Sequence, residues 1–271
     1  MRANPILEIL ISTMNRTDLS FLKAMFPHHK PSDFQILIVN QTQQEIDLES
    51  TYETIRVINS REFGLSKSRN LAIENAIGDI LLIADDDIEY LPNFNKIILQ
   101  AYEDYPEATL ISFQYLPDIE KLKKKYPANE GYTKSKKHRP FSIEMTFKRK
   151  DILQMQIRMN ENFGLGSFFP CAEEQIFIQS ILSKGLRTAY VAKPIVKHFG
   201  ETTGYNQAEP GFIGGLTAQK FLMYKNWTYL WLIKFVFFLY RHKFVSFVGQ
   251  FQAYKIGMRA ISEIRKIQNE N

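Results

Sequence analysis

Residues 81–89 read LLIADDDIE, an apolar run that leads directly into three consecutive aspartates, Asp85, Asp86 and Asp87. An uninterrupted apolar run of this length predicts a strand that is buried on both faces, as in a parallel sheet. Adjacent carboxylates repel one another, so a bound cation would stabilise them. One interpretation is a metal site at the carboxyl edge of the sheet, where open α/β sheets bind ligands. The other is a solvated acidic turn, in which Asp86 or Asp87 caps the next helix.

Strand and helix patterns alternate on both sides of this stretch. We expect further strands at residues 6–12, 34–39, 55–58, 109–115, 141–147 and 188–192. Helices are expected at residues 17–25, 64–76, 92–105 and 173–183. A β-α-β order of this kind predicts an α/β fold, with a mostly parallel sheet and helices on both of its faces.

The composition limits the class of protein. The chain has 271 residues and is 45% hydrophobic, which is enough for one large domain or two small ones. Its net charge of +5 suits an anionic ligand, an anionic membrane surface or nucleic acid. Cys171 is the only cysteine, which excludes an internal disulfide and indicates a reducing compartment. We expect neither a signal peptide nor a transmembrane helix, since no apolar run reaches about 18 residues.

Two acidic residues and one histidine are further candidates for chemistry. Glu173 and Glu174 open the helix that we expect at residues 173–183. There they either complement the helix dipole, which is worth about 0.3–1 kcal/mol, or supply a general base. His198 follows a predicted strand and precedes a glycine-rich segment. It is therefore either a structural histidine or a metal ligand that loop closure brings to the site.

Two segments differ in composition from the predicted sheet. Residues 117–140 are rich in lysine, with Tyr126 and Tyr132 among them, and form either a solvated loop or a flap on the acceptor side. Residues 215–271 are apolar, aromatic and basic, and acidic residues are absent from them before Glu263. This pattern predicts amphipathic helices that lie in a membrane interface. The alternative is that these helices pack on the rest of the chain or on a second subunit.

Short motifs follow one another in a definite order: Ser12-Thr13-Met14-Asn15-Arg16, Asn40-Gln41, Gly64 to Asn70, Gly78-Asp79, Asp85-Asp86-Asp87, Glu173-Glu174 and His198. In this order they resemble the GT-A-fold, family 2-like nucleotide-sugar glycosyltransferases, over about residues 6–205. Gly64 to Asn70 matches the family's G-x-x-x-x-R-N pattern, and the aspartates match its D-x-D motif. Asn40 departs from the pattern, because the second strand of the family usually ends in an aspartate. The resemblance implies a GT-A (Rossmann-like) sheet with flanking helices.

The resemblance also implies a nucleotide-sugar donor, which we expect to be a UDP-sugar. Thr13, Asn40 and Arg69 would lie around the nucleotide base, and Asp85 would belong to the same donor site. An amide both donates and accepts hydrogen bonds, whereas a carboxylate only accepts them. Asn40 therefore leaves the identity of the base open.

A divalent metal, Mn²⁺ or Mg²⁺, is the implied cofactor. Asp85 and Asp87 would hold it, with Asp86 as the alternative ligand, and the metal would neutralise the departing diphosphate. His198 would be a further ligand or a contact to the diphosphate. The catalytic base of the family is usually the second member of the acidic pair, which is Glu174 here. Glu173 is the other candidate, or it would orient the acceptor.

We therefore expect an inverting, metal-dependent glycosyltransferase, with a GT-A catalytic domain at residues 1–214 and a membrane-associating helical extension at residues 215–271. The acceptor would be a saccharide or polyprenyl-linked saccharide in surface polysaccharide synthesis, at the cytoplasmic inner face of a membrane. One alternative is a non-catalytic sugar- or membrane-binding scaffold. Another is a nucleotidyltransferase, although the turn after the first strand lacks the glycine-rich loop usual there. We do not expect a nucleic-acid partner, since the lysines lie beside carboxylates that repel phosphate.

Overall fold

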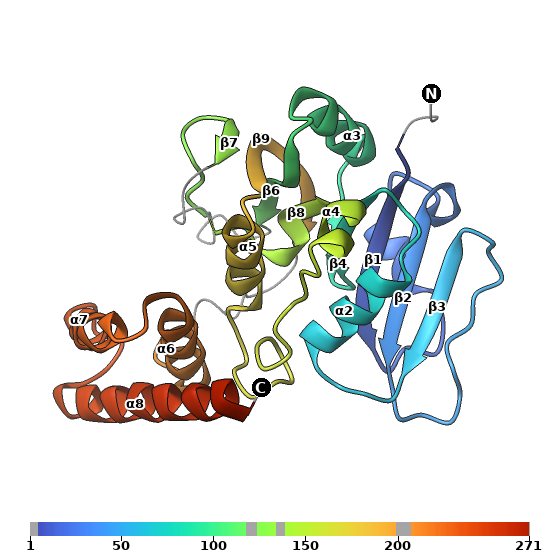
Figure 1. The fold of residues 1–271 in the computed structure, drawn as a ribbon. Coiled ribbons are helices and arrows are strands. Elements are labelled where there is room, and N and C mark those ends of the chain that lie inside the picture. The colour runs from blue at the N-terminus through green and yellow to red at the C-terminus, as the bar shows by residue number, and fades with distance from the viewer. Residues whose placement is uncertain (1–4, 118–123, 134–138, 199–206, 271) are drawn as a thin grey trace. The chain divides into compact units, whose positions relative to one another are not determined.

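The computed structural model describes residues 5–117, 124–133, 139–198 and 207–270 (Figure 1). It contains two compact units. The first comprises Met1–Asn160 and Glu174–Gly200, and the second comprises Glu161–Glu173 and Glu201–Asn271. The boundary that we expected after residue 214 lies inside the second unit.

The first unit is built on a mixed sheet that is nine-stranded within the described residues. Its strands are β1 (Leu7–Met14), β2 (Gln35–Gln41), β3 (Ile55–Ser60), β4 (Ile80–Asp85), β5 (Ile88–Tyr90), β6 (Ala108–Pro117), β7 (Gly131–Thr133), β8 (Met145–Lys148) and β9 (Arg187–His198). They lie in the order β3-β2-β1-β4-β8-β6-β9-β5, and β7 also pairs with β9. Strands β3, β2, β1 and β4 are parallel, as are β6 and β9. The short strands β5, β7 and β8 are antiparallel to their neighbours.

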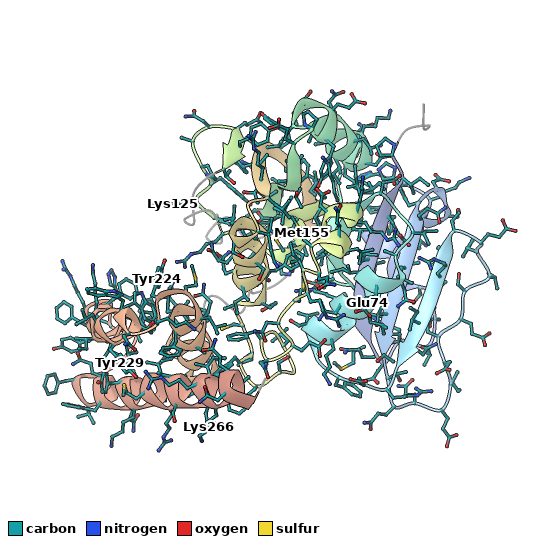
Figure 2. The ribbon with its side chains drawn as sticks, viewed as in Figure 1. Glu74, Lys125, Met155, Tyr224, Tyr229 and Lys266 are labelled. Atoms are coloured by element: carbon teal, nitrogen blue, oxygen red, sulfur yellow. The ribbon has the colours of Figure 1, made fainter. Side chains whose placement is uncertain are left out.

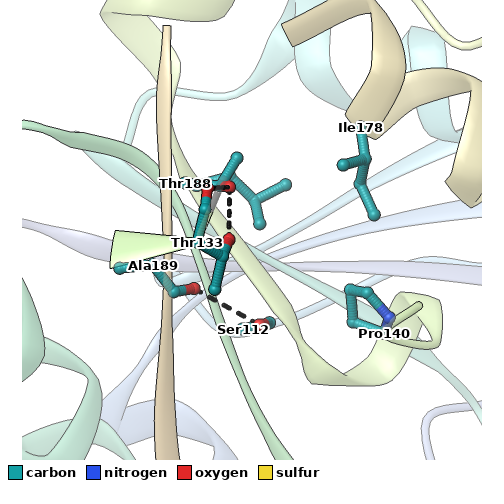
Figure 3. Close-up of a pocket in the computed structure, with 7 residues that line it drawn as sticks. Ser112, Thr133, Pro140, Ile178, Thr188 and Ala189 are labelled. Carbon is teal, nitrogen blue, oxygen red and sulfur yellow. Dashed lines mark hydrogen bonds between the residues drawn. The ribbon is translucent and has the colours of Figure 1, made fainter. Parts of the chain in front are cut away.

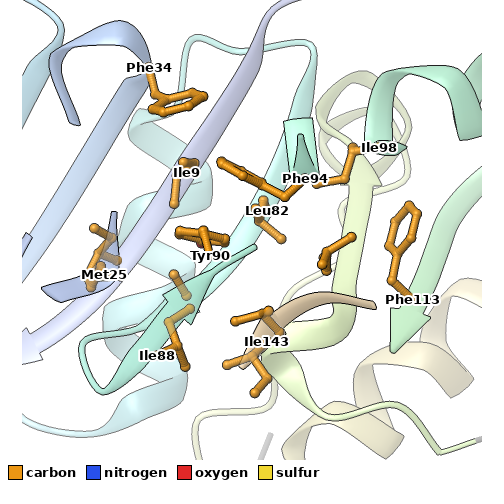
Figure 4. Close-up of a cluster of buried hydrophobic side chains, with 14 of the residues drawn as sticks. Ile9, Met25, Phe34, Leu82, Ile88, Tyr90, Phe94, Ile98, Phe113 and Ile143 are labelled. Atoms are coloured by element: carbon orange, nitrogen blue, oxygen red, sulfur yellow. The ribbon is translucent and has the colours of Figure 1, made fainter. Parts of the chain in front are cut away.

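Helices and apolar side chains cover both faces of this sheet. The helices are α1 (Phe21–Met25), α2 (Leu65–Asn75), α3 (Phe94–Asp104), α4 (Arg149–Gln154) and α5 (Glu173–Ser183). Successive strand residues point to opposite faces. Ile9 and Leu82 therefore pack with Phe94 on one face (Figure 4), whereas Leu10 and Leu81 belong to a separate cluster on the other. Burial on both faces explains the apolar run at residues 81–84, and it confirms the predicted α/β class.

The registers of the parallel strands bring the predicted donor residues to one edge. Thr13 lies opposite Asn40 in the pairing of β1 with β2, and Ser12 lies opposite Asp85 in the pairing of β1 with β4. The carboxyl ends of these three strands thus meet at the same place. This is the edge at which the sequence predicts a ligand.

The strand that we expected at residues 141–147 is only half correct. Residues Ser142–Glu144 form a 3₁₀ turn (η3), and pairing begins at Met145. The carboxylate of Glu144 accepts the N–H of Phe141 at 2.6 Å, which closes the turn on itself. Alternating apolar residues predict which side is buried, and they do not reveal such a local side-chain bond.

The second unit contains the helices α6 (Pro210–Tyr224), α7 (Trp227–Arg241) and α8 (Phe247–Glu270). Helix α8 packs against both of the others. A Cβ atom on Gly257 would lie only 2.4 Å from Leu232, so glycine permits the close approach of α8 to α7. Within the described part of the chain, none of the helices is both long and apolar enough to cross a bilayer.

Candidate active site

Asp85 and Asp86, at the end of β4, are each bound by an arginine. Nη2 of Arg69 donates to Oδ1 of Asp85 at 3.0 Å, and the Arg69 side chain is only 2% exposed. Nη2 and Nε of Arg16 donate to Oδ2 of Asp86 at 2.7 and 2.9 Å. The Thr13 hydroxyl donates to the same oxygen. The acidic cluster is therefore compensated by cations of the protein itself, which lowers the cost of adjacent carboxylates.

The G-x-x-x-x-R-N motif explains how Arg69 reaches this edge. Gly64 precedes α2 with φ of 128°, a conformation that side chains with a Cβ rarely adopt. Arg69 then lies on the buried side of α2 and contacts Asp85. The neighbouring Asn70 forms two hydrogen bonds with the backbone of Met159, at 2.8 and 2.9 Å. Asn70 thus anchors the helix, while Arg69 contacts the acidic cluster.

Asp87, the third aspartate, contacts His198. Their Oδ2 and Nε2 atoms lie 3.5 Å apart because β5 pairs with β9, placing Ile88 opposite His198. Asp87 is the most exposed of the three aspartates, at 57% of its side chain. The hydrogen bond to Asp87 raises the pKa of His198, and partial burial opposes this effect. The structure therefore joins two of the predicted metal ligands from distant parts of the chain.

The donor set suits a hard divalent cation only in part. Among the described residues, no three His, Cys, Asp or Glu side chains converge as a metal cluster. Asp87 and His198 supply one carboxylate oxygen and one imidazole nitrogen. Mg²⁺ commonly binds through one or two protein ligands and completes its shell with phosphate oxygens and water. The residues present fit a metal that binds together with a diphosphate, and they do not form a closed protein site.

Asn40 is completely buried, and partners within the protein occupy its amide. Its Nδ2 donates to the carbonyl of Arg16 at 2.9 Å and to Oδ1 of Asn59 at 3.0 Å. Its Oδ1 accepts the N–H of Arg16 at 3.0 Å. A carboxylate could not donate to the first two groups. This pattern explains the amide in place of the usual aspartate, and it shows that Asn40 holds the turn that carries Arg16.

The acidic pair opens α5 as predicted. Glu173 is buried, with 5% exposure, whereas Glu174 is partly exposed. The residue before them, Ala172, has φ of 77°, which is uncommon for any residue other than glycine. Such strained backbone often accompanies functional residues. Glu174 is the better placed of the two to meet a ligand from solution.

Glu144 was missed by the sequence reasoning. This fully buried carboxylate is bound by the ammonium of Lys124, by the hydroxyl of Tyr126 and by the N–H of Phe141. Burial raises the pKa of Glu144. Burial lowers the pKa of Lys124, and the negative charges of Glu144 and Glu174 oppose this lowering. The sequence offered one signal for this buried carboxylate, because Glu144 lies between the apolar residues Ile143 and Met145.

This cluster anchors the described part of the lysine-rich segment to the sheet. The Lys124 ammonium lies 4.1 Å from the ring centroid of Phe141, and the Tyr126 hydroxyl accepts the N–H of Tyr115 at 3.0 Å. The Tyr115 ring in turn lies edge-on to His198, with the centroids 6.4 Å apart. Residues 124–126 are therefore held beside the candidate site. The rest of the predicted flap lies partly at residues 118–123 and 134–138, outside the described residues.

A small cavity of about 10 Å³ lies beside β9 (Figure 3). Its polar lining includes Thr133 and Thr188, whose hydroxyls lie 2.6 Å apart, and Ser112, which donates to the carbonyl of Ala189. This volume holds about one water molecule. None of the predicted site residues lines it, and it cannot contain a nucleotide.

Sequence comparisons agree with the family that the motifs resemble. The family model described as "Glycosyl transferase family 2" matches residues 9–166. A protein of Haemophilus influenzae, described as an uncharacterized glycosyltransferase, is 30% identical over 132 residues. That match covers 47% of this chain and 42% of the relative, so the chain spans less than half of the relative's length.

Solved structures show the same fold. The crystal structure of S. aureus TarS 1-349 in complex with UDP-GlcNAc has a TM-score of 0.52 and 11% identity, covering 98% of this chain and 92% of that one. A structure of S. aureus TarS also has a TM-score of 0.52, with 12% identity, and covers 96% of this chain and 55% of that one. At this identity the likeness establishes the architecture alone.

Proposed function

This chain belongs to glycosyl transferase family 2, and from that premise we propose that it transfers a sugar from a nucleotide-sugar donor to an acceptor hydroxyl. The observation that carries the proposal is the edge of the sheet where Asp85, Asp86 and Asp87 meet Arg69, Arg16 and His198. This edge combines carboxylates for a metal with cations for phosphate. TarS was crystallised with UDP-GlcNAc, which supports a UDP-sugar as the donor.

Asp87 and His198 are the proposed metal ligands, with Asp85 and Asp86 as the alternatives. Bound Mn²⁺ or Mg²⁺ would supply Lewis-acid stabilisation of the departing diphosphate. Arg69 and Arg16 keep Asp85 and Asp86 in place, and their guanidinium groups offset carboxylate charge that would otherwise repel an anionic donor. Thr13 lies on the same edge and contacts Asp86, which supports its proposed place in the donor site.

Glu174 is the proposed catalytic base, and Glu173 is the alternative. The base takes the proton of the acceptor hydroxyl while the hydroxyl oxygen bonds to the anomeric carbon of the donor sugar. The bond from that carbon to the diphosphate breaks on the opposite side, so the configuration inverts. Partial exposure favours Glu174, because a base must come within hydrogen-bond reach of its substrate.

We further propose that residues 1–214 carry out this reaction and that residues 215–271 place it at the inner face of a membrane. The acceptor is then a saccharide or polyprenyl-linked saccharide of surface polysaccharide synthesis. The apolar and basic character of the extension supports this location.

The experiment that tests the function measures nucleoside diphosphate release from a panel of nucleotide sugars with Mn²⁺, with and without saccharide acceptors. We expect UDP release from one UDP-sugar, abolished by EDTA and strongly reduced in Asp87→Asn. Asp104→Asn, at the exposed end of α3, is the matched control and should retain activity. If calorimetry detected no metal-dependent binding of any nucleoside diphosphate, the non-catalytic scaffold would replace this proposal. Pyrophosphate release from a nucleoside triphosphate would indicate a nucleotidyltransferase.

A further inference from the structure

Helix α7 is apolar on both of its sides. It buries Leu232 and Leu239, yet it also exposes Trp227 at 73%, Leu230 at 60% and Phe237 at 56%. The outer side of a surface helix is normally polar. Exposed apolar side chains that gather on one surface mark an interaction site more often than chance.

The start of α8 continues this surface. Phe247, Val248 and Phe251 are each more than 60% exposed. Ring contacts join the two helices, since Phe247 lies 6.0 Å from Tyr240 of α7 and 6.1 Å from Phe251. Figure 2 shows side chains projecting outward from α7 and from the adjoining end of α8. We call this surface the aromatic face, and its residues are Trp227, Leu230, Ile233, Phe237, Tyr240, Phe244, Phe247, Val248 and Phe251.

The charges around the aromatic face have one sign. Lys234 and Arg241 are exposed on α7, Lys243 lies in the turn that follows, and Lys255 is exposed on α8. No aspartate or glutamate occurs in the sequence between Glu209 and Glu263. Lys234 lies four residues after Leu230 and three before Phe237, so these three residues are neighbours on the same side of α7. Lys234 is therefore surrounded by the apolar surface. A long lysine stem can cover apolar surface while its ammonium reaches a polar headgroup.

We propose that the aromatic face docks on a bilayer that contains anionic phospholipid. This proposal deepens the proposed function. It rests on that function only for the reason why the enzyme would need contact with a membrane. An interfacial helix combines buried aromatic and aliphatic side chains with lysine and arginine at the headgroup level. Each cation close to an anionic surface contributes about 1 kcal/mol.

A second copy of this chain fits the aromatic face less well. A two-fold interface places the same patch on both sides, so that Lys234 and Arg241 would face cations of the other copy. The face supplies no carboxylate to compensate them. Anionic lipid supplies the missing charge and an apolar interior together.

The geometry makes this contact superficial. Helix α7 has 15 residues, which corresponds to about 22 Å of helix. The hydrocarbon core is about 30 Å thick. The later part of α8 exposes polar groups, including Arg265, Lys266 and Gln268. The docking surface is therefore narrower than the extension expected at residues 215–271, and it comprises α7 and the first half of α8.

The chain carries its own reporter for this test. Its two tryptophans, Trp227 and Trp231, both lie in α7, and Trp227 is the more exposed. In full-length Trp231→Phe protein, Trp227 emission reports on the aromatic face alone. We expect vesicles of phosphatidylcholine with phosphatidylglycerol to shift this emission to shorter wavelength, and brominated lipid to quench it. Phosphatidylcholine alone, or high salt, should weaken binding about tenfold or more.

Two variants and two controls separate the contributions. Phe247→Ser/Phe251→Ser and Lys234→Glu/Arg241→Glu should each reduce vesicle binding at least about tenfold. Ile46→Ser and Lys150→Glu, exposed residues of the first unit, should leave it unchanged. Unaltered Trp227 emission with anionic vesicles would overturn the proposal. A dimer in solution that Phe247→Ser/Phe251→Ser converts to monomer would assign the face to a second copy instead.

Vesicle binding is measured without donor, metal or acceptor. Its failure would leave diphosphate release intact, and failure of glycosyl transfer would leave vesicle binding intact. Since the aromatic face contains no proposed active-site residue, Phe247→Ser/Phe251→Ser should retain transfer to a water-soluble acceptor. Equal loss of that transfer and of vesicle binding would contradict a docking role.

Discussion

Nε2 of His198 lies 3.5 Å from Oδ2 of Asp87, so the last aspartate of the acidic cluster contacts the end of the last strand of the sheet. Arginines bind the other two aspartates, whereas this pair contains the one partner that can lose its proton near neutral pH. A metal that binds here requires neutral imidazole. The protonation state of His198 therefore links metal binding to pH.

The first prediction concerns stability in metal-free protein. Because Asp87 raises the pKa of His198, the protonated pair stabilises the fold below the ordinary pKa of 6.5. This contribution is lost as pH rises through the raised pKa of the folded state. Its size should stay below about 1 kcal/mol, since Asp87 is 57% exposed. Thermal unfolding in EDTA, measured for wild type and His198→Gln from below pH 6.5 to above the raised pKa, gives the size of this contribution. Equal pH dependence of stability in the two proteins would contradict it.

The second prediction concerns Asn40→Asp, which restores the residue usual in the family. The carbonyl of Arg16 would lose its donor, and Oδ1 of Asn59 would keep only the N–H of Leu48. Both oxygens would face a buried carboxylate instead. We expect a loss of about 1–3 kcal/mol in the free energy of unfolding by urea. Asn75→Asp, an exposed amide at the end of α2, should cost much less. Wild-type stability of Asn40→Asp would show that the amide is not the required donor.

The third prediction treats Glu144 and Lys124 as a unit. Glu144→Gln leaves a mostly buried ammonium without its carboxylate, and Lys124→Met leaves the carboxylate without its ammonium. Each single change should cost about 2–4 kcal/mol, whereas the double variant should recover most of that loss. Glu107→Gln in the exposed pair with Arg187 is the control and should cost less than about 1 kcal/mol. Additive costs in the double variant would refute the coupling.

The fourth prediction tests the backbone before the acidic pair. Ala172→Gly permits φ of 77° without a Cβ clash and should stabilise the fold by about 0.5–1 kcal/mol. If the strained conformation positions α5, the same change should lower kcat. Gln156→Gly removes a comparable strain at φ of 52° in a position away from α5. It should stabilise the protein without changing kcat, and an equal fall in both variants would rule out a positioning role for Ala172.

The sequence predicted the features that follow from hydrophobic pattern and chain order. The apolar run before Asp85 predicted the buried central strand. The resemblance to the glycosyltransferase family implied a shared donor site for Thr13, Asn40 and Asp85, and the strand registers bring them to one edge. Glu173 begins α5 as expected. These outcomes depend on periodicity and on the rule that parallel strands end together.

The missing features are side-chain contacts between distant segments. The antiparallel pairing of β5 with β9 brings Asp87 to His198. Strand β5 has only three residues, which is too short for a recognisable strand pattern in the sequence. The hydrogen-bond partners of Asn40 come from a turn and from β3, so its burial was not visible in β2 alone. The role of Glu144 was not predicted, because the residues of this 3₁₀ turn have the same alternating pattern as a strand.

The last prediction decides between the two candidate bases. Glu174→Gln keeps the shape and polarity of the side chain but cannot take a proton, so kcat should fall about 10²–10⁴-fold with little change in KM. Glu173→Gln should affect kcat less, because Glu173 is buried. Glu103→Gln on α3 is an exposed control that should change neither constant. Steady-state transfer rates with a fixed acceptor distinguish these cases, and full activity of Glu174→Gln beside an inactive Glu173→Gln would reassign the base to Glu173.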